Sequence, residues 1–181
     1  MNKDNSSKIK DLIRTIPNYP KNGIMFRDIT TLIGDAEGLK LTLDAFCEFA
    51  SNLEFDIVAG IEARGFIFAP MVAYKMNKPF VPIRKKGKLP GKTLSQNYKL
   101  EYGEDTIEMH EGAVTKGQKV LLIDDLLATG GTATAAAQLI IQAGGIVEHS
   151  AFVVDLPDLH GKDVLNAQNI NVHCIVEFEG E

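Results

Sequence analysis

The stretch 120–135, VLLIDDLLATGGTATA, limits the possible folds of this chain more than any other part of it. Its first four residues, 120–123, are aliphatic and predict a central parallel strand that is covered on both faces. Two aspartates and a loop of small residues follow. The alanine-rich segment 133–143 then has high helix propensity and ends at Gly144 and Gly145, a common signal for a helix C-terminus. A strand, a short loop and a helix in this order are typical of an α/β fold.

The loop between this strand and this helix has the composition of an anion-binding site. It comprises Ala128, Thr129, Gly130, Gly131 and Thr132. Small residues let the backbone turn sharply, and the free amides and the dipole at a helix N-terminus favour a negative charge. The loop lacks the lysine that contacts the outer phosphates in G-x-x-x-x-G-K-[ST] loops. We therefore expect it to bind one terminal phosphate.

Asp124 and Asp125 come directly after the expected strand. Ionised carboxylates accept hydrogen bonds, so the pair could bind two vicinal ribose hydroxyls or a hydrated divalent cation. The simpler interpretation is that the aspartates cap a turn and that the glycines only permit it. The length of the whole motif favours the binding site. A response-regulator receiver also has paired aspartates, but beside its first strand and without such a loop.

The composition indicates one domain. The 181 residues are 45% hydrophobic and 24% charged, which is enough for a substantial core. The formal net charge of -5 argues against a nucleic-acid-binding surface. No segment has the length of a signal-peptide core or a membrane span, so we expect a cytoplasmic protein without membrane contact. The two cysteines and four histidines lack metal-ligand spacing, so no metal site built from side chains is predicted.

Strand and helix patterns alternate along the rest of the chain. The expected strands are 55–61, 80–83, 146–155 and 172–178, and the expected helices include 6–14, one capped by Asp35, and 66–75. The alternation predicts an α/β protein with a mainly parallel, twisted sheet flanked by helices.

Charged residues follow two of these strands. Glu62 and Arg64 come after the strand 55–61. The planar fork of Arg64 suits a pyrophosphate oxygen, but the two residues could equally form a surface ion pair of little consequence. Basic residues follow the next strand, where the segment 85–106 is long enough for an active-site lid. A two-stranded excursion is expected within this lid.

The segment 17–34 is expected to form a small N-terminal hood. Pro20 and Gly23 are typical of a loop, yet three apolar residues stand in a row at 24–26. Phe26 could fold back into the core or stack on a planar ligand.

Four further strings carry a resemblance to a known family. They are YPKNGIMFRDIT, EARGF, IRKKGKLPG and YKLEYG. Together with the motif at 124–132, they resemble the bacterial adenine phosphoribosyltransferases in content, order and spacing, over nearly the full length of the chain. Those enzymes have the type I phosphoribosyltransferase fold, with a hood and a flexible lid loop. Ala63 is a conservative departure from relatives that carry serine there.

The resemblance implies a purine salvage enzyme. Its reaction transfers 5-phosphoribosyl from phosphoribosyl diphosphate (PRPP) to N9 of adenine, giving AMP and pyrophosphate. The loop 128–132 would hold the 5-phosphate, and Asp124 and Asp125 would hold the ribose hydroxyls. Magnesium is implied as the cofactor, bound mainly through PRPP and pyrophosphate.

The same resemblance implies a pyrophosphate site and a homodimer. Arg64 and Lys88 would contact pyrophosphate, with Arg84 and Lys85 nearby. Lys88 would come from the partner subunit. Because the transition state has oxocarbenium character, Arg64 is expected to act in catalysis by stabilising the departing pyrophosphate, while the lid excludes water.

Adenine would lie under the hood. Phe26 would stack on it, the backbone of Met25 would pair with its Watson–Crick edge, and Arg27 would secure the hood. Glu101 would act at the N7 side of the purine as an electrostatic or proton-handling partner, and Tyr102 would help to close the site.

Two alternatives differ in substrate or in class. Phosphoribosyltransferases for 6-oxopurines usually read O6 with a lysine after the shared motif, and Lys162 is the only lysine in the C-terminal segment. A non-catalytic regulator that senses PRPP should carry a DNA-binding extension or a basic face, and this acidic chain has neither.

Overall fold

The computed structural model describes residues 3–99 and 103–180. Its strands are β1 (Arg14–Pro17), β2 (Met25–Asp28), β3 (Ile57–Ile61), β4 (Phe80–Lys85), β5 (Thr93–Lys99), β6 (Glu104–His110), β7 (Lys119–Leu127), β8 (Ile146–Asp155) and β9 (Asn171–Glu177). Its helices are α1 (Lys3–Asp11), α2 (Thr30–Ile33), α3 (Ala36–Ala50), α4 (Gly65–Lys75), α5 (Gly131–Gln142), the short η1 (Pro157–Leu159) and α6 (Gly161–Asn166).

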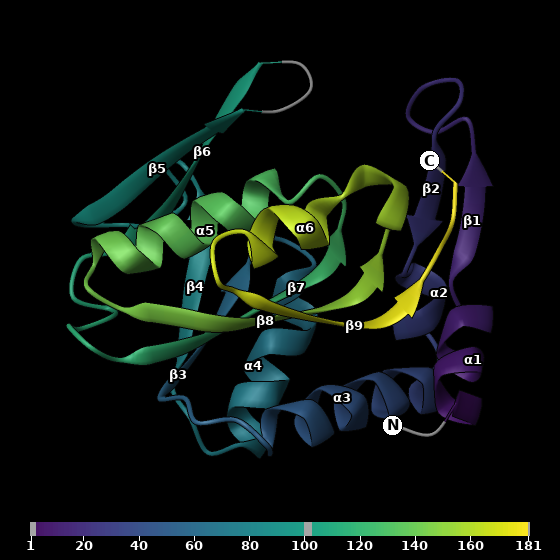
Figure 1. The fold of residues 1–181 in the computed structure, drawn as a ribbon, viewed down its shortest axis with the longest axis horizontal. Helices are drawn as coiled ribbons and strands as arrows, with labels where there is room; N and C mark the ends of the chain where they lie inside the picture. Colours follow the sequence, from purple (N-terminus) through teal and green to yellow (C-terminus); the bar gives the residue numbers. More distant parts are fainter. Residues whose placement is uncertain (1–2, 100–102, 181) are drawn as a thin grey trace.

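Seven of the strands form one sheet, in the order β5-β6-β4-β3-β7-β8-β9 (Figure 1). The strands β4, β3, β7, β8 and β9 are parallel, whereas β6 is antiparallel to β4 and β5 is antiparallel to β6. Helices cover both faces of the sheet. The predicted α/β fold with a mainly parallel sheet is confirmed.

Two apolar clusters hold the helices to the sheet. Ile9, Phe46 and Phe68 bring α1, α3 and α4 onto one face, where they pack against residues such as Leu121. The alanine-rich α5 packs with α6 on the other face, against residues such as Leu122. Because β7 is covered on both faces, its apolar run is continuous and not alternating.

The strand β7 is longer than the sequence indicates. The apolar run predicts an end at Asp124, but the strand continues to Leu127. Asp124 and Leu126 pair with Phe152 and Val154 of β8, so the neighbouring strand keeps this polar stretch extended. Both aspartates therefore lie on a fixed strand and not on a loop.

The predicted ends of other elements agree to different extents. The strand predicted at 146–155 has those bounds as β8, and Asp35 caps α3 by accepting a hydrogen bond from the amide of Gly38 at 2.7 Å. The first helix was predicted at 6–14, but α1 ends at Asp11, because Arg14 already pairs with Asp28 in a strand.

Two hairpins stand at opposite ends of the molecule in Figure 1. The strands β1 and β2 form a separate two-stranded sheet within and beside the predicted hood, here called the N-terminal hairpin. The strands β5 and β6 form the other hairpin, which includes most of the predicted lid and packs on α5. None of the described helices is long and apolar enough to cross a membrane.

Candidate active site

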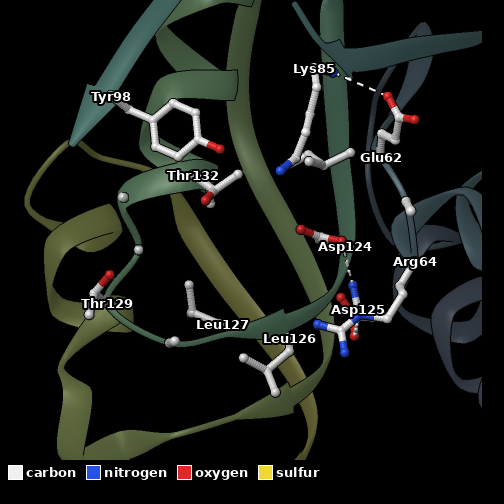
Figure 2. Close-up of a pocket in the computed structure, with 16 residues that line it drawn as sticks. Glu62, Arg64, Lys85, Tyr98, Asp124, Asp125, Leu126, Leu127, Thr129 and Thr132 are labelled. Carbon is white, nitrogen blue, oxygen red and sulfur yellow. Dashed lines mark hydrogen bonds and ion pairs between the residues drawn. The ribbon is translucent and has the colours of Figure 1, made fainter. Parts of the chain in front are cut away.

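A pocket of about 490 Å³ opens where the carboxyl ends of β3, β4 and β7 meet (Figure 2). Ligand sites of open parallel sheets lie at this edge because the loops after the strands converge there. The lining residues are Ile61 to Arg64, Lys85, Tyr98, and Asp124 to Ala133. The pocket therefore brings together both predicted aspartates, all five residues of the predicted phosphate loop, Arg64 and Lys85.

The loop Ala128–Thr132, here called the glycine loop, turns directly into α5. Gly130 has a φ of 80°, a left-handed conformation that glycine adopts without steric cost, and it is the last residue before the helix. The first amides of α5 have no carbonyl partner within the helix, so they are free to bind an anion. Thr129 and Thr132 add hydroxyl groups at the same rim of the pocket (Figure 2).

The start of α6 packs closely under the glycine loop. A Cβ atom at Gly161 would lie 2.2 Å from the carbonyl oxygen of Ala128 and 2.9 Å from the amide nitrogen of Gly130. Only a glycine allows this approach. The sequence alone does not identify Gly161 as part of the site, because the contact joins segments that are distant in sequence.

Asp124 and Asp125 differ in their partners. Arg64 Nε lies 2.9 Å from Asp125 Oδ2, and the Asp125 side chain is only 4% exposed. Asp124 Oδ1 accepts a hydrogen bond from the amide of Asp125 at 2.9 Å. Burial and the adjacent charge of Asp125 raise the pKa of Asp124 well above its usual value. Burial also raises the pKa of Asp125, but the charge of Arg64 opposes that rise.

The end of β4 is tied to the end of β3 by Glu62. Arg84 donates to both Glu62 oxygens, at 3.1 and 2.9 Å, and Glu62 also accepts from the amide of Lys85 at 3.1 Å. These bonds lower the pKa of Glu62, with Arg84 as the main cause. The surface pair of Glu62 with Arg64, which the sequence left open, is not formed. Arg84 instead lies outside the pocket lining, and its guanidinium is held by Glu62.

Lys85 and Tyr98 link the pocket to the β5–β6 hairpin. Lys85 Nζ lies 3.2 Å from Asp105 Oδ2, and Asp105 accepts a hydrogen bond from the Tyr98 hydroxyl at 3.3 Å. In Figure 2 the Lys85 side chain extends into the pocket and the Tyr98 hydroxyl is directed toward Thr132 of the glycine loop. Asp105 raises the pKa of Lys85, so its ammonium group stays charged.

The N-terminal hairpin brings Phe26 to the edge of this site. The Arg64 guanidinium lies 5.7 Å from the centre of the Phe26 ring, and Tyr19 contacts the same ring edge-on at 5.2 Å. Met25, Phe26 and Arg27 are not part of the pocket lining. The Arg27 side chain is directed away from the pocket, because it donates to the carbonyl oxygens of Glu179 and Gly180.

The remaining predicted site residues are Lys88, Glu101 and Tyr102. Lys88 is exposed and does not line the pocket. Glu101 and Tyr102 lie outside the described residues.

Glu62 and Tyr98 are pocket residues to which the sequence analysis gave no role. Tyr98 shares one face of β5 with Leu94, and both pack against the core. The alternation of side chains along a strand could therefore have placed Tyr98 on the same face as Leu94. For Glu62, the signal was its position after a strand beside Arg64, but its true partner is 22 residues away.

Comparison with known proteins gives a consistent result. Residues 42–178 match the phosphoribosyl transferase domain family. An adenine phosphoribosyltransferase from Chlorobium phaeobacteroides is 52% identical over 175 residues, which cover 96% of this chain and 99% of the relative. The crystal structure of adenine phosphoribosyltransferase from Thermoanaerobacter pseudethanolicus is 43% identical, with a TM-score of 0.91, and the match covers 96% of this chain and 99% of that one.

A third similar protein was solved with ligands. The adenine phosphoribosyltransferase of Saccharomyces cerevisiae, in complex with D-2,5-dideoxy-2,5-imino-altritol 1,6-bisphosphate and adenine, is 33% identical. Its TM-score is 0.89, and the match covers 96% of this chain and 99% of that chain.

Proposed function

This chain belongs to the adenine phosphoribosyltransferases, and from that premise we propose how its own residues carry out the reaction. The enzyme transfers 5-phosphoribosyl from PRPP to N9 of adenine and releases AMP and pyrophosphate, a purine salvage reaction. The relatives named for adenine support this substrate, since they match the chain over nearly its whole length.

The proposal depends mainly on one observation: a phosphate-binding loop and a pair of aspartates lie side by side in one pocket. The glycine loop at the start of α5 offers amides and hydroxyls to one phosphate, and Asp124 and Asp125 offer carboxylates to ribose hydroxyls in the same pocket. A ribose 5-phosphate has both groups on one ring. The loop lacks the lysine of nucleoside-triphosphate loops, which favours a single phosphate at this position.

Pyrophosphate is bound on the opposite side of the ribose. Among the described residues, Arg64 and Lys85 are the cations that line the pocket. Arg64 keeps donors for pyrophosphate because its Nε is the atom closest to Asp125. Arg84 acts indirectly, since its hydrogen bonds to Glu62 fix the end of β4 from which Lys85 extends.

The donor atoms of the site fit a magnesium ion that is bound mainly through its substrate. Among the described residues no cluster of three or more metal-binding side chains occurs. Magnesium commonly takes one or two carboxylates together with substrate phosphates, and Asp124 and Asp125 are suited to that share. When bound, the ion would neutralise charge on the diphosphate.

Adenine lies under the N-terminal hairpin. Phe26 stacks on the purine and the Met25 backbone pairs with its edge, while Arg27 secures the hairpin. The closeness of Phe26 to Arg64 supports this arrangement, because Arg64 is a pocket residue. Glu101 interacts with the N7 side of adenine, and Tyr102 closes the site.

The chemistry requires charge stabilisation more than a nucleophile. As the bond from the anomeric carbon to pyrophosphate breaks, positive charge develops on the sugar and negative charge on the leaving group. Arg64 and Lys85 stabilise the leaving group. The β5–β6 hairpin, held to the pocket by Lys85 and Asp105, excludes water that would otherwise hydrolyse the sugar.

A panel of bases tests the substrate. Pyrophosphate release with PRPP and magnesium should be fastest with adenine and slow with hypoxanthine, guanine and xanthine. A preference for hypoxanthine or guanine would contradict the assignment. Binding of PRPP without any pyrophosphate release would favour a regulator.

The role of Glu101 has its own test. Glu101→Ala should lower kcat more than it raises KM for adenine, because the interaction strengthens in the transition state. The reverse pattern would make Glu101 a binding residue.

The active assembly is a homodimer in the cytoplasm. The dimer is supported by Lys88, a predicted pyrophosphate ligand that does not line the pocket of its own chain. The cytoplasmic location stays a prediction from the sequence, and cell fractionation tests it.

A further inference from the structure

The Arg27 side chain lies between the N-terminal hairpin and the segment that follows β9. It donates to Thr15 Oγ1 at 2.7 Å within the hairpin, to the Glu179 carbonyl at 2.9 Å and to the Gly180 carbonyl at 3.1 Å. Its guanidinium also lies 4.8 Å from the centre of the Phe178 ring. Arg27 is 7% exposed. A buried cation with these partners fixes the hairpin to residues 178–180.

Residues 178–180 are themselves tied to the body of the protein. The ammonium group of Lys10, on α1, lies 4.9 Å from the centre of the Phe178 ring. The amide of Phe178 donates to the Asp155 carbonyl at 3.0 Å, and the amide of Gly180 donates to Asp158 Oδ2 at 2.8 Å. Figure 1 shows this segment running beside β1 and β2. We call residues 178–180 the strap.

The N-terminal hairpin needs such a tie because it shares no backbone ladder with the main sheet. β1 and β2 pair only with each other among the described strands. A two-stranded ribbon is not rigidly oriented by itself. Its position beside the pocket therefore depends on side-chain contacts. The contact of Arg27 with the strap is one of them, and it joins the C-terminal segment of the chain to the N-terminal hairpin.

We propose that the strap is a positioning element for adenine. It holds the N-terminal hairpin in the position from which Phe26 can stack on the base. Strap residues do not line the pocket. They act through Arg27, one residue along the chain from Phe26. This inference rests on the proposed adenine site under the hairpin. It adds that the affinity of this site for adenine is set by a distant segment of the chain, since Arg27 and Glu179 are 152 residues apart.

The test is a split between the two substrates. Phe178→Ala removes the ring between Lys10 and Arg27, and it should raise KM for adenine about five- to tenfold while KM for PRPP and kcat change less than about twofold. Phe178→Tyr keeps the aromatic face and should restore the adenine KM. Glu179→Ala is the matched control: its carbonyl remains to accept from Arg27, so the adenine KM should stay at the parent value.

A second variant leaves the aromatic contact in place. Asp158→Ala removes only the acceptor for the Gly180 amide and should raise the adenine KM about twofold, again without an effect on PRPP. An unchanged adenine KM in both Phe178→Ala and Asp158→Ala would overturn the proposal. So would equal rises of both KM values, or loss of folding in Phe178→Ala without any adenine effect in Asp158→Ala.

Phe26→Ala separates this proposal from the adenine site on which it rests. If Phe26→Ala raises the adenine KM and the strap variants do not, the strap inference is wrong and the hairpin site stands. If Phe26→Ala has no effect on the adenine KM, the hairpin site itself is wrong.

Discussion

At the scale of single residues, Asp124 and Asp125 are adjacent but electrostatically different. Asp125 has Arg64 at 2.9 Å, whereas burial and the charge of Asp125 raise the pKa of Asp124. A raised carboxyl pKa means that the folded chain binds a proton that the unfolded chain releases. The free energy of unfolding therefore falls as pH rises from the unfolded pKa of Asp124 to its folded pKa. The ionised carboxylate of Asp124, which is proposed to bind a ribose hydroxyl, is therefore disfavoured in the protein without substrate.

Asp124→Asn should separate stability from binding. The amide removes the disfavoured charge, so at neutral pH the free energy of unfolding should rise by about 1 kcal/mol, or roughly 2–4 °C in Tm. The KM for PRPP should rise at least about tenfold, because the amide is a poorer acceptor for ribose hydroxyls. Thermal unfolding and initial rates measure both effects. Asp163→Asn, an exposed position, is the control for charge alone, and a less stable Asp124→Asn would contradict the argument.

Gly65 is required where α4 begins beside Asp124. A Cβ atom there would lie 2.8 Å from Asp124 Oδ1 and 3.0 Å from the Ile123 carbonyl oxygen. Gly65→Ala must push the strand end and the helix apart, so we expect a loss of about 1–3 kcal/mol of stability and a rise in KM for PRPP of at least about tenfold. Gly112→Ala, with open space around it and a φ of 76°, should lose stability without a change in KM. Equal KM effects in both variants would show that Gly65 acts through stability alone.

At the scale of elements, the β5–β6 hairpin meets the glycine loop through Tyr98. The hydroxyl donates to Asp105 and is directed toward Thr132. Tyr98→Phe keeps the ring packed but removes the hydroxyl, so KM for PRPP should rise about threefold with little change in KM for adenine. Steady-state kinetics with each substrate varied in turn decides this. Tyr74 is 87% exposed, so Tyr74→Phe should match the parent. An unaltered PRPP KM in Tyr98→Phe would disprove a role for the hydroxyl.

Sequence patterns predict the elements that one segment determines. The 146–155 strand contains the apolar run 151–154, and the glycine loop stands between a strand and a helix of strong signal, so both were predicted. The strands β1 and β2 were not predicted, because each has four residues and Pro20 and Gly23 between them indicate a loop. The two strands form because they pair with each other, and this pairing is not visible in either segment alone. The same reason explains why β7 continues past Asp124, since β8 pairs with that stretch.

In the site, too, features that one segment determines could be predicted, and features that depend on contacts between distant segments could not. Both aspartates, Arg64 and the glycine loop could be predicted, because each lies in or shortly after the carboxyl-terminal part of a strand that ends at the pocket. The bond of Glu62 to Arg84 could not, since it depends on β3 and β4 being neighbours in the sheet. Arg27 was predicted to secure the hood, but its partners in residues 178–180 are visible only in the folded chain.

At the scale of the whole molecule, the pocket of one chain supplies Arg64 and Lys85 as cations, while Lys88 is exposed and outside the lining. A diphosphate leaving group needs several positive charges at once. If Lys88 completes the neighbouring subunit's site, then each site of the dimer combines residues of two chains. A single inactive chain can then be complemented by a different inactive chain.

Mixing two inactive variants tests this arrangement. Lys88→Ala and Asp125→Ala should each lose most activity as pure dimers. In a mixed dimer, one site would contain both defects and the other would contain neither, provided that Lys88 acts across the interface. Since random assembly makes half of the dimers mixed, co-refolded protein should recover about a quarter of the parent activity. Each variant refolded alone is the control. If the mixture stays inactive while size-exclusion chromatography with a tagged copy shows mixed dimers, then Lys88 acts within its own chain, because every site would still contain one defect.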